Sequence, residues 1–333
     1  MGHGSYSVDT TAAKVAYQQA QGINPFAYSQ TQSQVPFDQR TAHPSLSPYG
    51  VDLRESRDSA DHPNSVAIAC LFDETASMGD GPRVLQTKLP ELFGTLLRRG
   101  FVEDPQIMMG AIGDAHNGEA APLQVGQFES DNRIDENLEN IYLELSGGGN
   151  GGETYGLGLY FLARHTAADC WDKRGKKGYV FLTGDENPHR NITRTEVKKY
   201  IGDTIETDLT IEQVLAEVQE RYEVFFLHVG NRQAQYQNSL QTWRDLLGDN
   251  VISLESLDTI CETIALTIGL MEGTLDSLDA GANSMVLEGA NRQAVASASR
   301  SLVKLAGRTG TVAPATNTTL PPTTTDGNRT RRL

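Results

Sequence analysis

Cysteine is scarce in this sequence. Its 333 residues include only Cys70, Cys170 and Cys261, which lie far apart and form no C-x-x-C pair. This spacing argues against a zinc knuckle and against a disulfide framework. We expect three free thiols packed in the interior, because reduced cysteine behaves as a small apolar side chain. Reduced thiols favour a cytoplasmic protein.

Long apolar runs are also absent. The first thirty residues contain no run of seven apolar residues, so we expect no signal peptide. The longest candidate for a membrane span, ICETIALTIGLM, carries Glu262 and is shorter than the roughly 18 residues that cross a bilayer. We therefore expect no contact with a membrane, and a cytoplasmic location.

Basic residues are in the minority. The chain has 28 Lys and Arg against 43 Asp and Glu, a formal net charge of -15. A nucleic-acid-binding protein needs clustered bases to neutralise phosphates, so we expect no nucleic-acid partner. The charge is also uneven: residues 281–333 carry seven bases and two acids, whereas the first 280 residues carry a net charge of -20.

What is present indicates a globular protein with four segments. The apolar fraction of 38% and the charged fraction of 21% are ordinary for a folded chain. Residues 1–64 form a polar arm, which is either an interaction arm or a strap over the core. Residues 65–273 form one domain, and residues 274–305 a helical extension that reads as one more helix. The Thr- and Pro-rich tail, 306–333, is expected to be disordered.

Strands and helices alternate through residues 65–273. The apolar run SVAIACLF is typical of a strand that is covered on both faces. A helical pattern from residue 84 to 99 is bent or interrupted by Pro90, and another helix opens on Thr154 and continues to Trp171. The alternation predicts an α/β fold with a doubly wound, mostly parallel sheet and helices on both faces. Two strands follow each other near residues 107–128, so we expect the sheet to have an antiparallel edge strand there.

Oxygen-bearing side chains follow several of the predicted strands. In an open α/β sheet a ligand binds beyond the carboxyl ends of the strands. The D-x-T-x-S loop after the first strand offers a carboxylate and two hydroxyls from alternate positions, so all three can turn toward one point. Carboxylate and hydroxyl oxygens suit a hard cation such as Mg²⁺. His116 and His189 have no partner at metal-ligand spacing and are interpreted as exposed loop residues.

The pattern resembles the von Willebrand factor A domain family and its metal-ion-dependent adhesion site. That family has a first-strand motif D-x-S-x-S, matched here by Asp73, Thr75 and Ser77 in FDETASMGD. A threonine after the second helix is matched by Thr154 in GGGNGGETYG, and an aspartate after the next strand by Asp185 in YVFLTGDENPH. The order T-G-D replaces the family's usual T-D-G, which shifts the aspartate by one residue.

The resemblance implies a role for each matched residue. Thr75 and Ser77 would bind a divalent cation directly, either Mg²⁺ or alternatively Mn²⁺ or Ca²⁺. Thr154 would join them when a ligand is bound. Asp73 and Asp185 would act through water and hold the hydroxyls in place. Three further acids are expected to support these ligands: Asp114, Glu153 and Glu186.

The resemblance covers residues 65–273 and implies a six-stranded sheet with one antiparallel edge strand. It also implies binding rather than catalysis: a partner protein's Asp or Glu would complete the coordination of the cation, which makes the chain an adaptor or scaffold. The glycine-rich run with Glu153 is similar to intracellular and microbial members, which indicates a bacterial or phage protein. Such relatives work beside AAA-type ATPases or protein kinases. The partner and the oligomeric state stay open.

Two alternatives remain from other classes. A metal-dependent phosphohydrolase would use Asp73 as its nucleophile, but its usual D-x-D pattern has an acid where this chain has Thr75. A structural or assembly protein would instead make its contacts through the terminal arms. A serine hydrolase is set aside, because no G-x-S-x-G turn follows a strand.

Overall fold

The computed structural model describes residues 4–144, 151–230 and 234–309. The predicted disorder of the tail lies outside these residues from position 310 on. Residues 306–309 belong to a helix, α14 (Val303–Thr309). Among the described residues, no helix is long and apolar enough to cross a membrane. The three cysteines are buried and free, as the sequence predicts.

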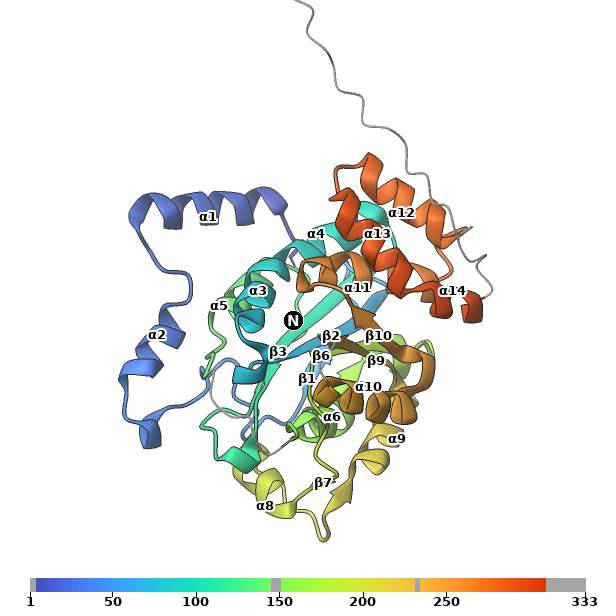
Figure 1. Ribbon diagram of the computed structural model, residues 1–333. Coiled ribbons are helices and arrows are strands. Elements are labelled where there is room, and N and C mark those ends of the chain that lie inside the picture. The colour runs from blue at the N-terminus through green and yellow to red at the C-terminus, as the bar shows by residue number, and fades with distance from the viewer. Residues whose placement is uncertain (1–3, 145–150, 231–233, 310–333) are drawn as a thin grey trace, which may run out of the picture.

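A six-stranded sheet forms the centre of the molecule (Figure 1). All neighbouring strands are parallel except β3 and β4, which pair antiparallel at one edge. In spatial order the strands are β10 (Val251–Leu254), β9 (Tyr222–Val229), β6 (Gly178–Gly184), β2 (Ser65–Asp73), β3 (Asp104–Ile112) and β4 (Leu123–Val125). The predicted doubly wound, mostly parallel sheet with an antiparallel edge strand is therefore confirmed.

Helices cover both faces of the sheet. Alternate residues of β2 enter different apolar clusters: Ile68 and Phe72 pack on one face, Ala69 and Leu71 on the other. A strand with both faces covered needs a continuous apolar run, which explains its sequence. The first face carries α3 (Gly81–Lys88), α4 (Pro90–Arg99), α5 (Arg133–Glu139) and α11 (Ile260–Met271). The second carries α6 (Tyr155–Arg164), α7 (Asp169–Asp172), α9 (Ile211–Arg221) and α10 (Ala234–Leu247).

The parallel register brings three loops to one edge of the sheet. Asp73 at the end of β2 is level with Ile112 at the end of β3. Phe72 is level with Thr183, near the end of β6. The chain therefore leaves β2, β3 and β6 at neighbouring points, and side chains that follow these strands lie close together.

One predicted helix is interrupted at Pro90, as expected, and another is shorter than expected. Pro90 begins a new helix, α4, because proline fits the first position of a helix, where its missing N–H is not needed. The helix that opens on Thr154 was expected to reach Trp171, but α6 ends at Arg164. The chain then forms β5 (Thr166–Ala168), which pairs with β1 (Arg54–Ser56) of the arm. A contact with a distant segment ends this helix, and periodicity cannot reveal such a contact.

The C-terminal extension contains three helices where one was expected. They are α12 (Leu278–Leu287), α13 (Arg292–Ser301) and α14. Gly289, with φ of 97°, turns the chain after α12 in a conformation that favours glycine. The Asn291 side chain then caps α13 by accepting hydrogen bonds from two backbone N–H groups. All three helices pack into the cluster that contains α11.

The arm has two parts. Its first part holds α1 (Val8–Gln21) and α2 (Ala27–Gln34), neither of which has a buried residue. Its second part is a strap, with Leu46 fully buried and β1 added to β5. The remaining short elements are β7 (Asn191–Ile192), β8 (Leu209–Thr210), α8 (Arg194–Glu196), the π-helical turn Val197–Ile201, and 3₁₀ turns at Phe37–Gln39, Ala76–Met78, Ala115–Asn117, Gly248–Asn250 and Leu257–Thr259.

Candidate metal centre

Asp73 is fully buried at the end of β2 and accepts three hydrogen bonds. Its Oδ1 accepts from the backbone N–H of Thr75 at 2.8 Å and from the Thr75 hydroxyl at 2.6 Å. Its Oδ2 accepts from the Tyr155 hydroxyl at 2.8 Å. Burial raises the pKa of Asp73 to about 6, although these donors act in the opposite direction. The carboxylate is thus fixed in position before any ligand arrives.

Four of the five predicted ligands form one connected chain. The hydroxyl oxygens of Thr75 and Ser77 lie 3.1 Å apart. The Ser77 hydroxyl also donates to Asp185 Oδ1 at 2.9 Å. Asp185 is therefore the aspartate that reaches the motif, despite the shifted T-G-D order. Burial, followed by the charge of Asp73, raises the pKa of Asp185 to about 7.

The spacing of the two hydroxyl oxygens is informative. The Thr75 hydroxyl lies within hydrogen-bond distance of Asp73 and the Ser77 hydroxyl within that of Asp185. The two hydroxyl oxygens lie 3.1 Å apart, and either can donate to the other. Adjacent ligands of an octahedral Mg²⁺ with bonds of 2.0 to 2.1 Å lie about 2.9 Å apart. The pair of oxygens therefore has the spacing of two neighbouring ligands of a hard cation.

Thr154 is close to this chain but not part of it. It precedes α6, and its hydroxyl accepts a hydrogen bond from the backbone N–H of Ala115 at 2.8 Å. Its own N–H donates to the carbonyl of Gly113. The next residue, Tyr155, makes the contact with Asp73. The structure thus ties the start of α6 to the loops after both β2 and β3.

Glu153 gives an independent indication of a cation. It is fully buried, and among the described residues neither of its carboxylate oxygens has a hydrogen bond of good geometry, although the Thr75 hydroxyl is near enough to lower its pKa somewhat. Burial raises its pKa to about 10, and the charges of Asp73, Asp114 and Glu119 add to the rise. A buried carboxylate without a donor is costly. A divalent cation would supply the missing counter-charge, so these residues fit the metal that the sequence predicts.

The other two supporting acids line the edges of the site. Asp114 Oδ1 accepts from the backbone N–H of His116 and lies 2.8 Å from Nε2 of His189. Burial raises the pKa of Glu186, and its charge raises the pKa of Asp73 and Asp185.

Helix α10 fixes the loop that carries Asp185 and Glu186. Ser239 donates to the carbonyl of Asp185 at 2.6 Å. Trp243 Nε1 donates to the carbonyl of Glu186 at 3.0 Å.

The two histidines are more ordered than the sequence suggests. The rings of His116 and His189 stack with centroids 3.7 Å apart. His116 Nε2 lies 2.8 Å from Glu196 Oε1, and His189 lies against Asp114. The interpretation as an exposed loop residue is confirmed for His116, whose side chain is 40% exposed in the turn after β3, and is wrong for His189, whose side chain is only 15% exposed. Their partners come from segments more than seventy residues apart in sequence, which explains why spacing did not reveal the pair.

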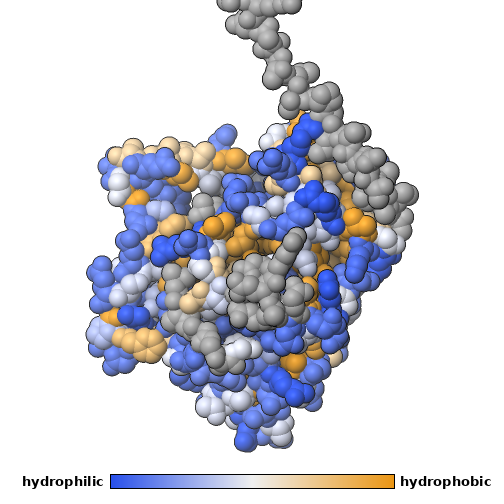
Figure 2. Space-filling model, in the orientation of Figure 1, coloured by the Kyte–Doolittle hydropathy of each residue, from blue (hydrophilic) through white to orange (hydrophobic). Residues whose placement is uncertain are grey.

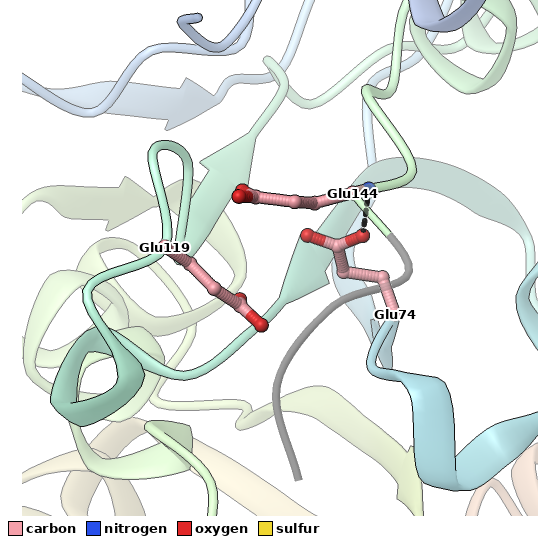
Figure 3. A group of neighbouring side chains, drawn as sticks. All are labelled: Glu74, Glu119 and Glu144. Atoms are coloured by element: carbon pink, nitrogen blue, oxygen red, sulfur yellow. Dashed lines mark hydrogen bonds between the residues drawn. The ribbon is translucent and has the colours of Figure 1, made fainter. Parts of the chain in front are cut away.

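Three glutamates converge beside the candidate centre, and sequence reasoning missed them. Glu74, Glu119 and Glu144 each place a carboxylate oxygen within 4.8 Å of the others (Figure 3). Glu74 Oε2 accepts from the backbone N–H of Glu144, and Glu119 Oε2 from that of Asp114, both at 2.6 Å. Burial raises the pKa of Glu119 to about 8, and the charges of Glu144 and Asp114 raise it further. Glu74 is the unspecified position of D-x-T-x-S, so no motif marks it.

Comparison with known proteins gives remote structural similarities only. No family model and no curated protein matches the sequence. The pilus adhesin SpaC from Lactobacillus rhamnosus GG in its open conformation matches with a TM-score of 0.43 and 12% identity, over 65% of this chain and 31% of that one. Proximal thread matrix protein 1 from the mussel byssus matches with a TM-score of 0.40 and 11% identity, over 64% and 48%. Its form with a zinc-occupied MIDAS motif has a TM-score of 0.40 and 12% identity, over 60% and 47%. The chain spans less than half the length of each, and these similarities are too low to assign a family.

Proposed function

We propose that this chain is a divalent-cation-dependent protein-binding module. The observation that carries the proposal is the pair of hydroxyl oxygens of Thr75 and Ser77, which lie 3.1 Å apart and each contact a buried carboxylate. A bound Mg²⁺, Mn²⁺ or Ca²⁺ would supply positive charge and an open coordination position for a carboxylate of the partner.

Each residue of the site has a distinct task in this proposal. Thr75 and Ser77 bind the cation through their hydroxyl oxygens. Asp73 and Asp185 orient those hydroxyls and balance the charge. Tyr155 holds Asp73 in place through the hydrogen bond to Oδ2. Thr154 joins when the partner is bound, through the lone pair of its hydroxyl oxygen that the N–H of Ala115 does not use.

The surrounding charge favours one kind of partner. Glu153, Glu186 and Asp114 lie near the site, and the first 280 residues carry a net charge of -20. Such a surface disfavours an acidic partner except at the cation itself. The partner is therefore a protein with one exposed Asp or Glu within a neutral or basic surface. An adaptor or scaffold role follows from such a contact.

The geometry favours binding over phosphohydrolysis. A second acid two residues after Asp73 would serve as general acid in a D-x-D enzyme, but here that position is Thr75, whose hydroxyl donates to Asp73. The hydroxyl of Ser77 contacts the carboxylate of Asp185 and, among the described residues, no histidine, so the serine–histidine pair of a serine nucleophile is not formed there. The enzyme alternative would be favoured if the parent protein hydrolysed p-nitrophenyl phosphate with Mg²⁺ and Asp73→Asn did not. The binding proposal would then be wrong.

Calorimetry tests the proposal directly. We expect the parent protein to bind Mg²⁺ or Mn²⁺ at one site and Asp73→Ala to lose that binding while circular dichroism stays unchanged. Ser77→Ala, which removes one half-buried hydroxyl, should weaken binding with less risk to the fold. Asp276→Ala removes an exposed acid outside the site and serves as the matched control. Equal affinity in the parent and Asp73→Ala would sink the proposal.

A metal-dependent pull-down tests the partner. Proteins captured by the parent in Mg²⁺ should be released by EDTA and should not be captured by Asp73→Ala. The Asp276→Ala control should capture the same set as the parent. If the parent and Asp73→Ala recover the same partners, the metal bridge is wrong even where the cation binds.

A further inference from the structure

A long groove lies outside the candidate metal centre. It has a volume of about 1410 Å³ and runs between α1 on one side and α13 on the other, with α4 and the start of α11 below. Figure 1 shows α1 apart from the C-terminal helices, with α3 and α4 between them. In Figure 2, apolar side chains are visible along α1 and toward these helices, on a largely hydrophilic surface. The groove is thus an apolar channel framed by the arm and the C-terminal extension.

The apolar side of α1 and of the residues just after it is only partly covered by the described residues. Val8, Val15 and Ile23 are each between 43% and 47% exposed and line the groove. The helix is attached to α5 by polar contacts instead, such as Thr11 to Asp135 and Lys14 to Glu139. Isolated helices of about 14 residues are marginal in water. An occupant that covers this apolar side would therefore stabilise α1.

Three acids of the groove are left without an ion pair. Glu91, Asp258 and Glu262 line it, and none of the ion pairs between described residues includes any of them. Lys88 and Arg98 line the groove as well, so these acids are only partly balanced. The Oε2 atom of Glu262 is buried and has no hydrogen-bond partner in the described part of the chain, and burial raises the pKa of this residue although Lys88 lowers it. An occupant should therefore combine apolar residues with positive charge at one end.

Residues 310–333 of the same chain have this combination. They carry apolar residues near their start, such as Val312 and Leu320, and the bases Arg329, Arg331 and Arg332 near their end. We propose that residues 310–333 occupy the groove in the same molecule, with their bases against Glu91, Asp258 and Glu262. The apolar part would then lie along α1 and α13.

The connection makes this contact easy to reach. Arg300 lines the groove on α13, and residue 310 follows only ten positions later, after α14. A random-coil chain of 24 residues has an end-to-end distance of about 27 Å. A compact domain of this size has a radius of gyration of about 20 Å. An attached segment also has an effective concentration in the millimolar range, so a weak contact suffices.

Photo-crosslinking in the full chain tests the proposal. A benzoylphenylalanine in place of Val15, in the groove, should form crosslinks to peptides from residues 310–333. The same group in place of Tyr49, which is exposed on the strap outside the groove, should not. A mixture of ¹⁴N- and ¹⁵N-labelled chains separates crosslinks within a molecule from those between copies. Three results would overturn the proposal. Position 15 could crosslink to a second copy, it could form no crosslink to residues 310–333, or positions 15 and 49 could give equal yields.

Charge reversal supplies the second arm of the experiment. Glu91→Lys with Asp258→Lys changes two exposed residues and should lower the crosslink yield at least five-fold. Reversing Arg329, Arg331 and Arg332 to Glu should do the same without changing any residue that the structure describes. Combining both sets should restore the yield. An unchanged yield in either single set would show that the acids of the groove do not hold the segment.

Discussion

At the scale of single residues, the site depends on two hydroxyl oxygens held between two carboxylates. Thr75 contacts Asp73 and Ser77 contacts Asp185, and the two hydroxyl oxygens lie 3.1 Å apart. The motif supplies these groups, but the burial of Asp73 and its hydrogen bond from Tyr155 fix them. Removing these oxygens one at a time should therefore show which of them the metal needs.

Thr75→Val removes one hydroxyl oxygen at nearly constant shape. We expect Mn²⁺ affinity to fall at least ten-fold, which corresponds to about 1.4 kcal/mol, whereas Thr75→Ser keeps the oxygen and the affinity. The valine also leaves Asp73 with one donor fewer. Isothermal titration calorimetry on both variants provides the measurement. If valine binds the metal as well as serine does, Thr75 is not a ligand.

Tyr155→Phe removes the donor to Asp73 Oδ2 and little else. A hydrogen bond to a charged group contributes about 1.5 to 3 kcal/mol, so we expect a loss of stability in that range and a weaker metal site. Tyr222→Phe is the matched control, because it removes an equally buried hydroxyl that contacts Thr166, far from the site. Urea unfolding and calorimetry should show that both variants lose stability but that only Tyr155→Phe loses metal affinity.

Glu119→Gln tests the charge of the glutamate cluster. The pKa of Glu119 is raised by burial to about 8, and Glu74, Glu144 and Asp114 face it. A carboxyl group with a raised folded pKa stabilises the fold below its unfolded value and loses that effect as pH rises through about 8. The neutral glutamine should therefore stabilise the metal-free protein at pH 8 and change little at pH 4. Thermal unfolding in EDTA at both pH values measures the difference. If the glutamine variant and the parent differed in stability by the same amount at both pH values, the cost of burying a charged Glu119 would be contradicted.

At the scale of elements, the end of β6 approaches the start of α6 closely. A Cβ atom on Gly184 would collide with the hydroxyl of Tyr155 and touch Asp73. We expect Gly184→Ala to displace Tyr155, to weaken the metal site, and to cost about 1 to 3 kcal/mol through overpacking. Gly307→Ala on α14 meets no neighbour and should be neutral or slightly stabilising. Unfolding and calorimetry distinguish the two, and a neutral Gly184→Ala would contradict the close approach.

The sheet was predictable at this scale, whereas several helix boundaries were not. Apolar runs such as that of β2 report burial on two faces, a property of the strand itself. The end of α6 depends instead on β1, more than one hundred residues earlier, and the three C-terminal helices depend on packing against α11. The D-x-T-x-S motif and the resemblance built on it led to Asp185. No local pattern indicated Tyr155 or the partners of the histidines. Contacts between distant segments carry no local pattern.

At the scale of the whole molecule, the arm divides into a part with no buried helix residue and a part that belongs to the core. Residues 1–42 contribute α1 and α2, which lie on polar contacts, with Tyr6 packed against Phe93. The strap contributes buried Leu46, the β1–β5 pair and the ion pair of Arg57 with Asp169. The two parts should therefore respond differently to truncation.

Truncation of the arm is the whole-molecule prediction. Removing residues 1–42 should lower the free energy of unfolding by only about 1 to 2 kcal/mol, mainly because the contact of Tyr6 is lost. Removing residues 1–60 should lower it by several kcal/mol more, because this deletion also removes the buried Leu46 side chain and the β1–β5 strand pair. Urea unfolding measures both, and metal affinity should survive the shorter deletion because no arm residue contacts Asp73, Thr75 or Ser77 in the described hydrogen bonds. Sedimentation adds the test of the assembly alternative. If the shorter deletion dissociates an oligomer that EDTA leaves intact, the arm rather than the cation makes the functional contact.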